Sequence, residues 1–231
     1  MFRILEQKPI EQVFPKQWEL FNNNGYTSLN EDALYKWAAI LDIVDQFKPD
    51  SQTILDVGGG YAATTFLLSK EKQITNIDIN YNGNWFNSNK GIISNLKDYN
   101  INNIEFKQLN FLSESDYINN DYYDIVIDGC SLIHFDPRAE LDVKNIGLSL
   151  SADIISRKLK NDGLFIVSTD LNNEQGPESS EWLNAKSFVE IIQQSGFELI
   201  EDNTHQKLIN SRYNVKNLGT LTIGAFAFKK I

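Results

Sequence analysis

One segment of the sequence combines an acidic side chain with a run of glycines. Residues 53–63 read T-I-L-D-V-G-G-G-Y-A-A, so Asp56 precedes the triplet Gly58, Gly59 and Gly60. A glycine lacks a Cβ and can turn the chain sharply while its backbone lies directly against a ligand. A buried carboxylate just before such a loop would repel a phosphate but would favour a ligand with a positively charged end. The segment therefore predicts a binding loop for a nucleotide-like cofactor that carries a positive charge.

The same loop also satisfies a dinucleotide-binding pattern. Residues 58–63 fit G-x-G-x-x-G/A, and Asp78 lies 18 residues beyond Gly60, where it could hold a ribose. An NAD(P)- or flavin-dependent oxidoreductase is therefore an alternative interpretation. Against it stand Asp56 ahead of the glycines, the long segment before the first strand, and the antiparallel ending that the pattern predicts for the sheet.

The elements that must position this loop alternate between strands and helices. A helix with Ser28 or Asn30 as its cap should run from about residue 31 to Lys48-Pro49. The pattern then predicts strands at 53–57, 74–79, 104–109, 124–128 and 163–169, and helices at 62–71, 91–99, 143–160 and 185–195. This alternation implies parallel strands joined by right-handed crossovers. Two further strand-like runs, 197–202 and 220–229, have no helical pattern between them and predict an antiparallel pair at a sheet edge.

Residues 30–231 resemble the class I S-adenosylmethionine-dependent methyltransferases. I-L-D-V-G-G-G is similar to the first motif of that family, I-T-N-I-D-I-N to its second strand, Y-Y-D-I-V-I-D to its fourth, and L-K-N-D-G-L-F-I-V-S to the turn into its fifth. The resemblance implies an α/β fold, a Rossmann-like three-layer αβα sandwich with a seven-stranded, mostly parallel sheet and an antiparallel final strand. We expect this domain at 31–231 and an aromatic lid or extension at 1–30.

The resemblance also implies the cofactor, S-adenosylmethionine, and the residues that bind it. Gly58 and Gly60 would pass close to its methionine portion, with Asp56 near the amino group. Asp78 would accept hydrogen bonds from the ribose hydroxyls, which a charged acceptor serves well. The cofactor-binding residues that we predict are Asp56, Gly58, Gly59, Gly60, Asp78, Ile79, Asn110, Phe111 and Asp128.

Three of these residues depart from the family pattern or have a second interpretation. Asn110 stands where many relatives carry an aspartate that accepts from the adenine amine; it keeps an acceptor oxygen but loses the charge. Phe111 could supply a backbone N–H or a ring edge. Ile79, next to the ribose acid, is a packing or connector residue at this site.

The exit of the fourth strand, D-G-C-S-L-I-H-F at 128–135, is where a methyl acceptor should meet the cofactor. Many small-molecule methyltransferases carry Glu-His here, and this sequence has Ile133-His134. His134 could be the base for an acceptor that must lose a proton, since its ordinary pKa suits that duty. Alternatively, it caps a helix or bonds to the backbone near the cofactor.

A metal site or a reactive cysteine at the ends of these strands has less support from the sequence. Asp128, Asp170 and Asn172 resemble the oxygen ligands of catechol-type methyltransferases, but the 42 residues between the two aspartates and the lack of an adjacent Asp-Asn pair depart from that family. We therefore predict no metal. Cys130 is interpreted as a small buried residue without a catalytic role. Trp18 and Tyr26, in the aromatic N-terminal segment, either cover the sheet or line the acceptor pocket.

Composition limits the partners and the cellular location. The 21 basic against 31 acidic residues give a net charge of −10, so we expect no nucleic-acid partner. The chain has a single cysteine, which excludes an internal disulfide and fits a reducing cytoplasm. The N-terminus has no apolar core of signal-peptide length, and no stretch approaches 18 apolar residues, so we also expect no membrane association.

Together these features predict an S-adenosylmethionine-dependent methyltransferase that acts on an oxygen or nitrogen of a small molecule. A sugar or related metabolite would be compatible with a base at His134. The contrasting hypothesis is a catalytically silent cofactor-binding module, which Ile133 in place of an acid would suit. No feature of the sequence indicates a particular oligomeric state.

Overall fold

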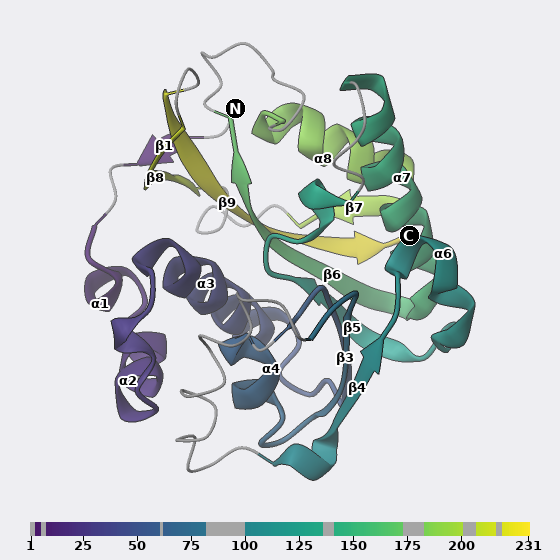
Figure 1. Cartoon of the computed structure of the whole chain (residues 1–231), viewed down its shortest axis with the longest axis horizontal. Helices are drawn as coiled ribbons and strands as arrows, with labels where there is room; N and C mark the ends of the chain where they lie inside the picture. Colours follow the sequence, from purple (N-terminus) through teal and green to yellow (C-terminus); the bar gives the residue numbers. More distant parts are fainter. Residues whose placement is uncertain are drawn as a thin grey trace.

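The computed structural model describes residues 3–5, 8–60, 62–81, 100–135, 141–172, 183–200, 207–215 and 219–231. Within them, one twisted nine-stranded sheet crosses the molecule with helices on both faces (Figure 1). Across the sheet the strands are β1 (Arg3–Leu5), β8 (Lys207–Val215), β9 (Gly219–Lys230), β6 (Leu159–Leu171), β5 (Tyr123–Asp128), β2 (Thr53–Val57), β3 (Gln73–Asp78) and β4 (Ile104–Gln108), and β7 (Phe197–Leu199) also pairs with β9. Among these strands β9 alone runs opposite to the others.

All seven predicted strands are present, as β2, β3, β4, β5, β6, β7 and β9. The prediction of a Rossmann-like sandwich with a reversed final strand is confirmed. The strands β1 and β8 were not predicted, because the segment that forms β8 is polar and lacks an apolar alternation. β7 and β8 pair antiparallel with opposite ends of β9, so that Phe197 lies opposite Lys230 and Ile209 lies opposite Ile223.

The helices form the two outer layers. α3 (Glu31–Phe47) and α4 (Ala63–Leu68) cover one face of the sheet, while α7 (Leu141–Lys158), α8 (Ala185–Gln194) and the short α6 (Phe111–Glu114) cover the other (Figure 1). α1 (Ile10–Val13) and α2 (Pro15–Asn23) pack beside α3. Single 3-10 turns occur at Tyr26–Ser28, Ile101–Asn103, Ser115–Tyr117 and Leu132–His134. The predicted helix at 91–99 lies outside the described residues.

Alternating side chains of the central strands divide the core in two. Leu55 and Val57 face the side of α7 and α8, whereas Ile54 faces α3 and α4. This alternation follows from the period of two in a strand. Both sides are apolar because helices cover both faces of a mostly parallel sheet.

α3 begins and ends as its sequence predicts. The side chain of Asn30 accepts a hydrogen bond from Asp32 N at 2.8 Å, and the helix ends at Phe47, with Lys48 as its C-cap. Pro49 follows, and a residue before proline disfavours the helical conformation. The helix thus gains an N-cap that stabilises it by about 1 kcal/mol.

The N-terminal segment shares the core on the α3 side. Ile10, Phe21 and Tyr26 are buried, and the Tyr26 ring lies edge-on to Phe21 and Trp37, with centroids 6.1 and 6.2 Å away. The burial of Tyr26 favours its interpretation as cover rather than as a pocket wall. The division of the chain at residue 30 stays a prediction.

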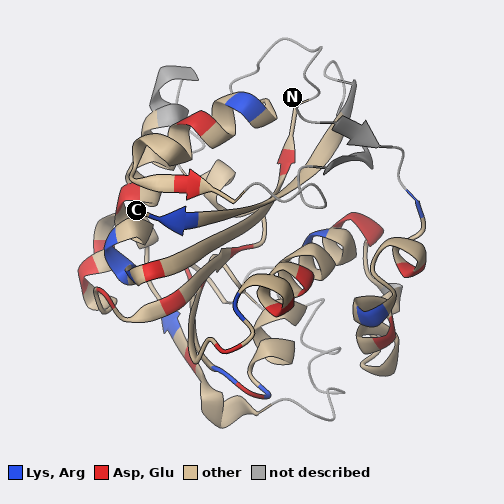
Figure 2. Cartoon of the chain, turned by 180° about the vertical axis from the view of Figure 1, so that it is seen from behind, with Lys and Arg blue, Asp and Glu red and all other residues tan. Residues whose placement is uncertain are grey.

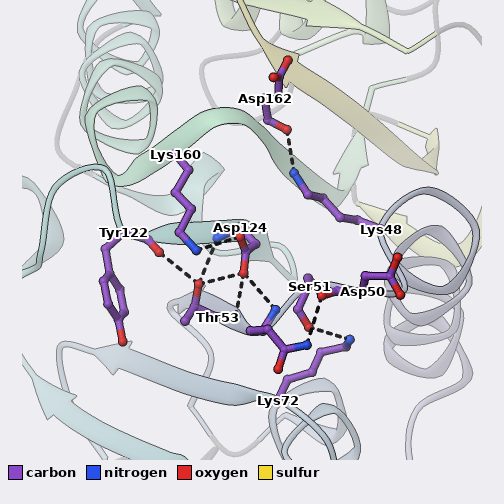
Figure 3. Close-up of polar contacts among 10 residues, drawn as sticks. Lys48, Asp50, Ser51, Thr53, Lys72, Tyr122, Asp124, Lys160 and Asp162 are labelled. Atoms are coloured by element: carbon purple, nitrogen blue, oxygen red, sulfur yellow. Dashed lines mark hydrogen bonds and ion pairs between the residues drawn. The ribbon is translucent and has the colours of Figure 1, made fainter.

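A polar cluster fixes the amino ends of the strands (Figure 3). The Asp124 carboxylate accepts hydrogen bonds from Gln52 N at 2.8 Å, Thr53 N at 3.0 Å, Thr53 Oγ1 at 3.0 Å and Lys160 Nζ at 2.8 Å. Burial opposes ionisation of this carboxyl, but the hydrogen bonds from Lys160 and from residues 52 and 53 outweigh it and lower the pKa of Asp124 to about 2. The cluster ties β2, β5 and β6 together at one end and so sets how their other ends meet.

Acidic and basic positions are distributed over both helical layers and the sheet, and α3, α7 and α8 each carry both signs (Figure 2). Among these helices, none is both long and apolar enough to cross a membrane.

Candidate active site

The strand order reverses between β2 and β5, since the chain continues from β2 to β3 and β4 in one direction and from β5 to β6 in the other. In open α/β sheets, ligands bind beyond the carboxyl ends of the strands at such a switch point. The predicted residues meet at this edge. The glycine loop follows β2, Asp78 ends β3, and Asp128 ends β5.

The glycine loop requires glycine for reasons internal to the protein. Gly58 and Gly60 have φ values of 62° and 49°, in the left-handed region. A Cβ on Gly58 would lie 2.3 Å from the Cβ and Oγ of Ser131, and a Cβ on Gly59 would lie 2.4 Å from Asp56 Cγ and 2.5 Å from Asn76 Nδ2. The loop is therefore clamped between the exit of β5 and the side chains beneath it.

Asp56 lies beneath the loop, and its side chain is 1% exposed. The Thr65 hydroxyl donates to Asp56 Oδ2, while Asn76 Nδ2 donates to Thr65 Oγ1 at 2.7 Å and to the Gly60 carbonyl at 3.2 Å. Tyr81 extends the network by donating to Asn76 Oδ1 at 2.6 Å. Burial raises the pKa of Asp56 to about 7; the Thr65 hydrogen bond opposes this shift, and the charges of Asp128 and Asp78 add to it. Within the described residues, Oδ1 of Asp56 keeps its capacity to accept a hydrogen bond.

Asp78 connects the end of β3 to the loop. Asn80 N donates a hydrogen bond to its carboxylate at 3.0 Å. Burial raises the pKa of Asp78 above its ordinary value, although the backbone N–H groups of Asn80, Ile79 and Gly60 favour the charged form. Ile79 is 66% exposed. An apolar side chain therefore lies in the open beside the predicted ribose acid, where a ring could pack.

Asn110 has a structural role that the sequence analysis missed. Its side-chain oxygen caps α6 by accepting from Leu112 N at 3.0 Å and Ser113 N at 3.4 Å, and its own N–H donates to Glu114 Oε2 at 2.6 Å. Phe111 is buried, and its ring centroid lies 6.0 Å from that of Phe135. Contacts of Asn110 and Phe111 with adenine stay predictions.

Asp128 organises the exit of β5. This carboxylate is fully buried and accepts hydrogen bonds from Ser131 N at 2.8 Å, from the Ser131 hydroxyl, and from Leu132 N at 3.4 Å. Burial raises the pKa of Asp128 to about 6. Ser131 Oγ also lies 2.9 Å from the Val57 carbonyl, so the same serine fixes the end of β2. Asp128 thus supports the glycine loop through Ser131.

His134 ends the 3-10 turn that follows, and its side chain is exposed at the same edge. Its backbone N–H donates to the Ser131 carbonyl at 2.9 Å. The base role of His134 stays a prediction.

A further polar cluster lies on the β6 side of the edge. Lys36 Nζ, from α3, is 2.6 Å from Asp170 Oδ2, and the Cys130 thiol donates to the same oxygen at 3.4 Å. The sequence pattern indicates no role for Lys36 and places Asp170 only as a partner of Asp128 in a metal site. No local signal reveals the ion pair, because its two residues are 134 positions apart. No group of metal-binding side chains was found within the described ranges.

No protein-family model and no curated protein sequence matches the chain. Solved structures do match. A 1,6-didemethyltoxoflavin-N1-methyltransferase from Burkholderia thailandensis, with S-adenosylhomocysteine bound, has 14% identity and a TM-score of 0.57 over 97% of this chain and 91% of its own.

Two further structures have the same architecture. The N-methyltransferase NodS from Bradyrhizobium japonicum has 10% identity and a TM-score of 0.58, covering 87% of this chain and 97% of its own. The [4+2]-cyclase SpnF has 16% identity and a TM-score of 0.59, covering 84% and 80%. At such identities the likeness concerns architecture alone. The chain has the fold of the class I S-adenosylmethionine-dependent methyltransferases.

Proposed function

We propose that this protein is an S-adenosylmethionine-dependent methyltransferase that acts on an oxygen or nitrogen of a small molecule. The observation that carries the proposal is Asp56, a buried carboxylate directly beneath a glycine loop at the switch point of this fold. No hydrogen bond from the described residues reaches its Oδ1, and its raised pKa shows that the carboxylate charge is poorly compensated, so a positively charged ligand would stabilise it. The ammonium group of S-adenosylmethionine would supply that charge, whereas the pyrophosphate of a dinucleotide would be repelled.

The other residues of the edge fit the remaining parts of this cofactor. The backbone of Gly58 and Gly60 would lie against the methionine portion, and Asp78 would accept from both ribose hydroxyls. Ile79 would pack on the adenine, with Asn110 and Phe111 at its edge and Asp128 holding the loop through Ser131. Bound S-adenosylmethionine would supply an electrophilic methyl group on its sulfonium.

The chain's own contribution to methyl transfer is mainly positional. An in-line displacement requires the acceptor atom to be held opposite the sulfur, and correct positioning lowers such barriers by several kcal/mol, up to about 10. A base is needed where the acceptor is a hydroxyl. His134, exposed at the exit of β5, would then take the proton, and a sugar or related metabolite would suit that arrangement.

The alternative functions make different predictions. The [4+2]-cyclase that shares this fold carries another activity in its name, so the architecture alone does not assign the reaction. Ile133, at the position of the family's acid, keeps the silent cofactor-binding module as the second candidate. The reversed β9 and Asp56 beneath the loop both disfavour an NAD(P)-dependent oxidoreductase.

Titration calorimetry with S-adenosylmethionine, S-adenosylhomocysteine and NADH tests the cofactor assignment. We expect the first two to bind and NADH not to bind. Asp56→Asn should weaken S-adenosylmethionine binding by roughly tenfold to a hundredfold, since it removes a charge-assisted contact. Asp45→Asn, the same change at an exposed position of α3, is the control. Wild-type protein that fails to bind S-adenosylmethionine would contradict the proposal.

A screen of acceptors separates the enzyme from the silent module. The measurement is formation of S-adenosylhomocysteine with panels of amines, phenols and polyhydroxylated compounds. If a hydroxyl acceptor is found, His134→Ala should reduce turnover while cofactor affinity stays constant. Full turnover in that variant would exclude His134 as the base.

A further inference from the structure

Three elements bring Lys36, Cys130 and Asp170 together beside the predicted methyl-transfer site. Lys36 comes from α3, Cys130 follows β5, and Asp170 lies near the end of β6. The ion pair is largely but not fully enclosed, because the side chains of Lys36 and Asp170 keep 12% and 16% exposure. Both neighbours of Asp170 use the same oxygen, Oδ2. Among the described residues, no hydrogen bond reaches Oδ1, which therefore remains an acceptor.

The backbone holds this cluster in an uncommon conformation. Cys130 has φ of 81°, and the other described non-glycine residues with positive φ, Asp121 and Asp162, are of a type that tolerates it. Residues held in such a conformation persist only where their surroundings fix them, and they gather at functional sites. Here the hydrogen bonds between Asp128 and Ser131 fix the following turn. The result is that the thiol points at Asp170.

The protonation states of the cluster follow from its contacts. Burial raises the pKa of the Cys130 thiol to about 11, so it stays protonated and donates to Asp170. Burial lowers the pKa of Lys36, but Cys130 and Asp170 outweigh that effect and leave it above its ordinary value. Lys36 is therefore a charged ammonium group, and the Asp170 carboxylate is its counterion.

Charge then limits what can bind to Asp170 Oδ1. Asp170 Oδ1 can only accept a hydrogen bond, from an N–H or O–H, while the Lys36 ammonium is already engaged by Oδ2. The pair itself is neutral, so the remaining charges at this edge decide the sign of the ligand. Three more carboxylates, those of Asp56, Asp78 and Asp128, lie at the same edge in a chain of net charge −10. A site of this kind favours a ligand that carries or develops positive charge.

We propose that Asp170, held by Lys36 and Cys130, binds the methyl acceptor and that the acceptor is an amine. This inference rests on the proposed function and narrows it to nitrogen. The neutral amine would form the new N–C bond with its lone pair. The C–S bond breaks and leaves its electron pair on sulfur, so that the sulfonium becomes a thioether. Nitrogen acquires the positive charge beside Asp170 Oδ1 and then loses a proton to water.

Matched ring compounds test the proposal without knowledge of the natural acceptor. Benzylamine, benzyl alcohol and benzoate are titrated at millimolar concentration into protein loaded with S-adenosylhomocysteine, and heat is measured. Benzylammonium imitates the charged nitrogen after transfer, so wild-type protein should bind it more tightly than the other two. Asp170→Asn should reduce benzylamine affinity by about tenfold to a hundredfold, as for other charge-assisted hydrogen bonds. The same variant should improve benzoate binding, because Lys36 loses its counterion.

Controls separate this role from a general structural one. Asp45→Asn removes an exposed carboxylate from the ion pair with Lys16 and should change none of these affinities. The double variant Lys36→Gln, Asp170→Asn removes both charges, so it avoids a lone buried ammonium if the single variant folds poorly. It should also lose the preference for benzylamine. S-adenosylhomocysteine affinity should stay within about threefold in all variants.

Three results would overturn the inference. The first is that Asp170→Asn keeps its benzylamine affinity, and the second is that wild-type protein shows no preference for benzylamine. The third is that Asp170→Asn loses S-adenosylhomocysteine binding, which would assign the cluster to the cofactor. Failure of wild-type protein to bind S-adenosylhomocysteine would instead refute the proposed function. The benzylamine comparison would then be made on cofactor-free protein, with the same expected and contrary results.

Discussion

Replacing Gly58 by alanine should destabilise the protein through a contact that can be removed separately. The φ of 62° costs an alanine about 1–2 kcal/mol. The new Cβ would also lie 2.3 Å from Ser131 Cβ, and forced overlap of this kind in a packed interior costs about 1–3 kcal/mol. We therefore expect Gly58→Ala to lower the free energy of unfolding by about 2–5 kcal/mol in total.

A double-mutant cycle with Ser131→Gly isolates the contact. Ser131→Gly alone should also destabilise, because it removes the hydroxyl that bonds to Asp128 and Val57. It equally removes the atoms that an alanine at 58 would strike. The double variant should therefore be more stable than the sum of the single effects by about 1–3 kcal/mol. Urea unfolding, followed by the fluorescence of the four tryptophans, measures all of these free energies.

Gly196→Ala is the matched control. Gly196 has φ of 82°, but a Cβ there would meet nothing within 4 Å, so only the conformational cost of about 1–2 kcal/mol should appear. It should show no coupling to Ser131→Gly. A coupling energy near zero between positions 58 and 131, or equal costs for the alanines at 58 and 196, would refute the contact between the glycine loop and the exit of β5.

Three further predictions concern carboxylates and a helix cap. Asp124→Asn should lower the free energy of unfolding by about 2 kcal/mol at neutral pH. Because the folded pKa of about 2 lies below the ordinary value of 3.8, the wild-type advantage should persist above about pH 4 and vanish as pH falls towards 2 in acid-unfolding curves. The pH dependence of stability that Asp56 causes has the opposite sign, because its folded pKa of about 7 lies above the ordinary 3.8. Its contribution to stability should therefore fall as pH rises from about 4 to 7. Asp56→Asn should abolish this pH dependence in thermal unfolding. Asn110→Ala should lower the free energy of unfolding by about 1 kcal/mol because α6 loses its N-cap, whereas Asn110→Asp should keep the cap. If calorimetry shows the same S-adenosylmethionine affinity in both variants as in wild type, Asn110 has only the capping role.

Local patterns determined most of the elements of this fold. The caps and apolar repeat of α3 predicted its start and end, because capping and amphipathic spacing act within a few residues. The bounds of β2, 53–57, match the prediction, and so does the antiparallel pairing of β7 with β9. The predicted place of this pair at the sheet edge is wrong, because β8 and β1 extend the sheet beyond β9. The glycine triplet and the aspartates near it could also be recognised in the sequence, since charge and the ability of the backbone to approach a ligand closely depend on residue type and spacing alone.

Pairings between distant segments were decided only by the tertiary structure. The polar segment that forms β8 becomes a strand because the free edge of β9 offers it hydrogen bonds, which no local propensity shows. Gly58 must be glycine because Ser131, 73 residues later, packs against it. Lys36 is an unremarkable helical lysine in the sequence, and only the packing of α3 on β6 joins it to Asp170 and Cys130. Sequence spacing predicted the glycine loop and its acids, whereas the contacts of Gly58 with Ser131 and of Asp170 with Lys36 and Cys130 arise only once the chain has folded.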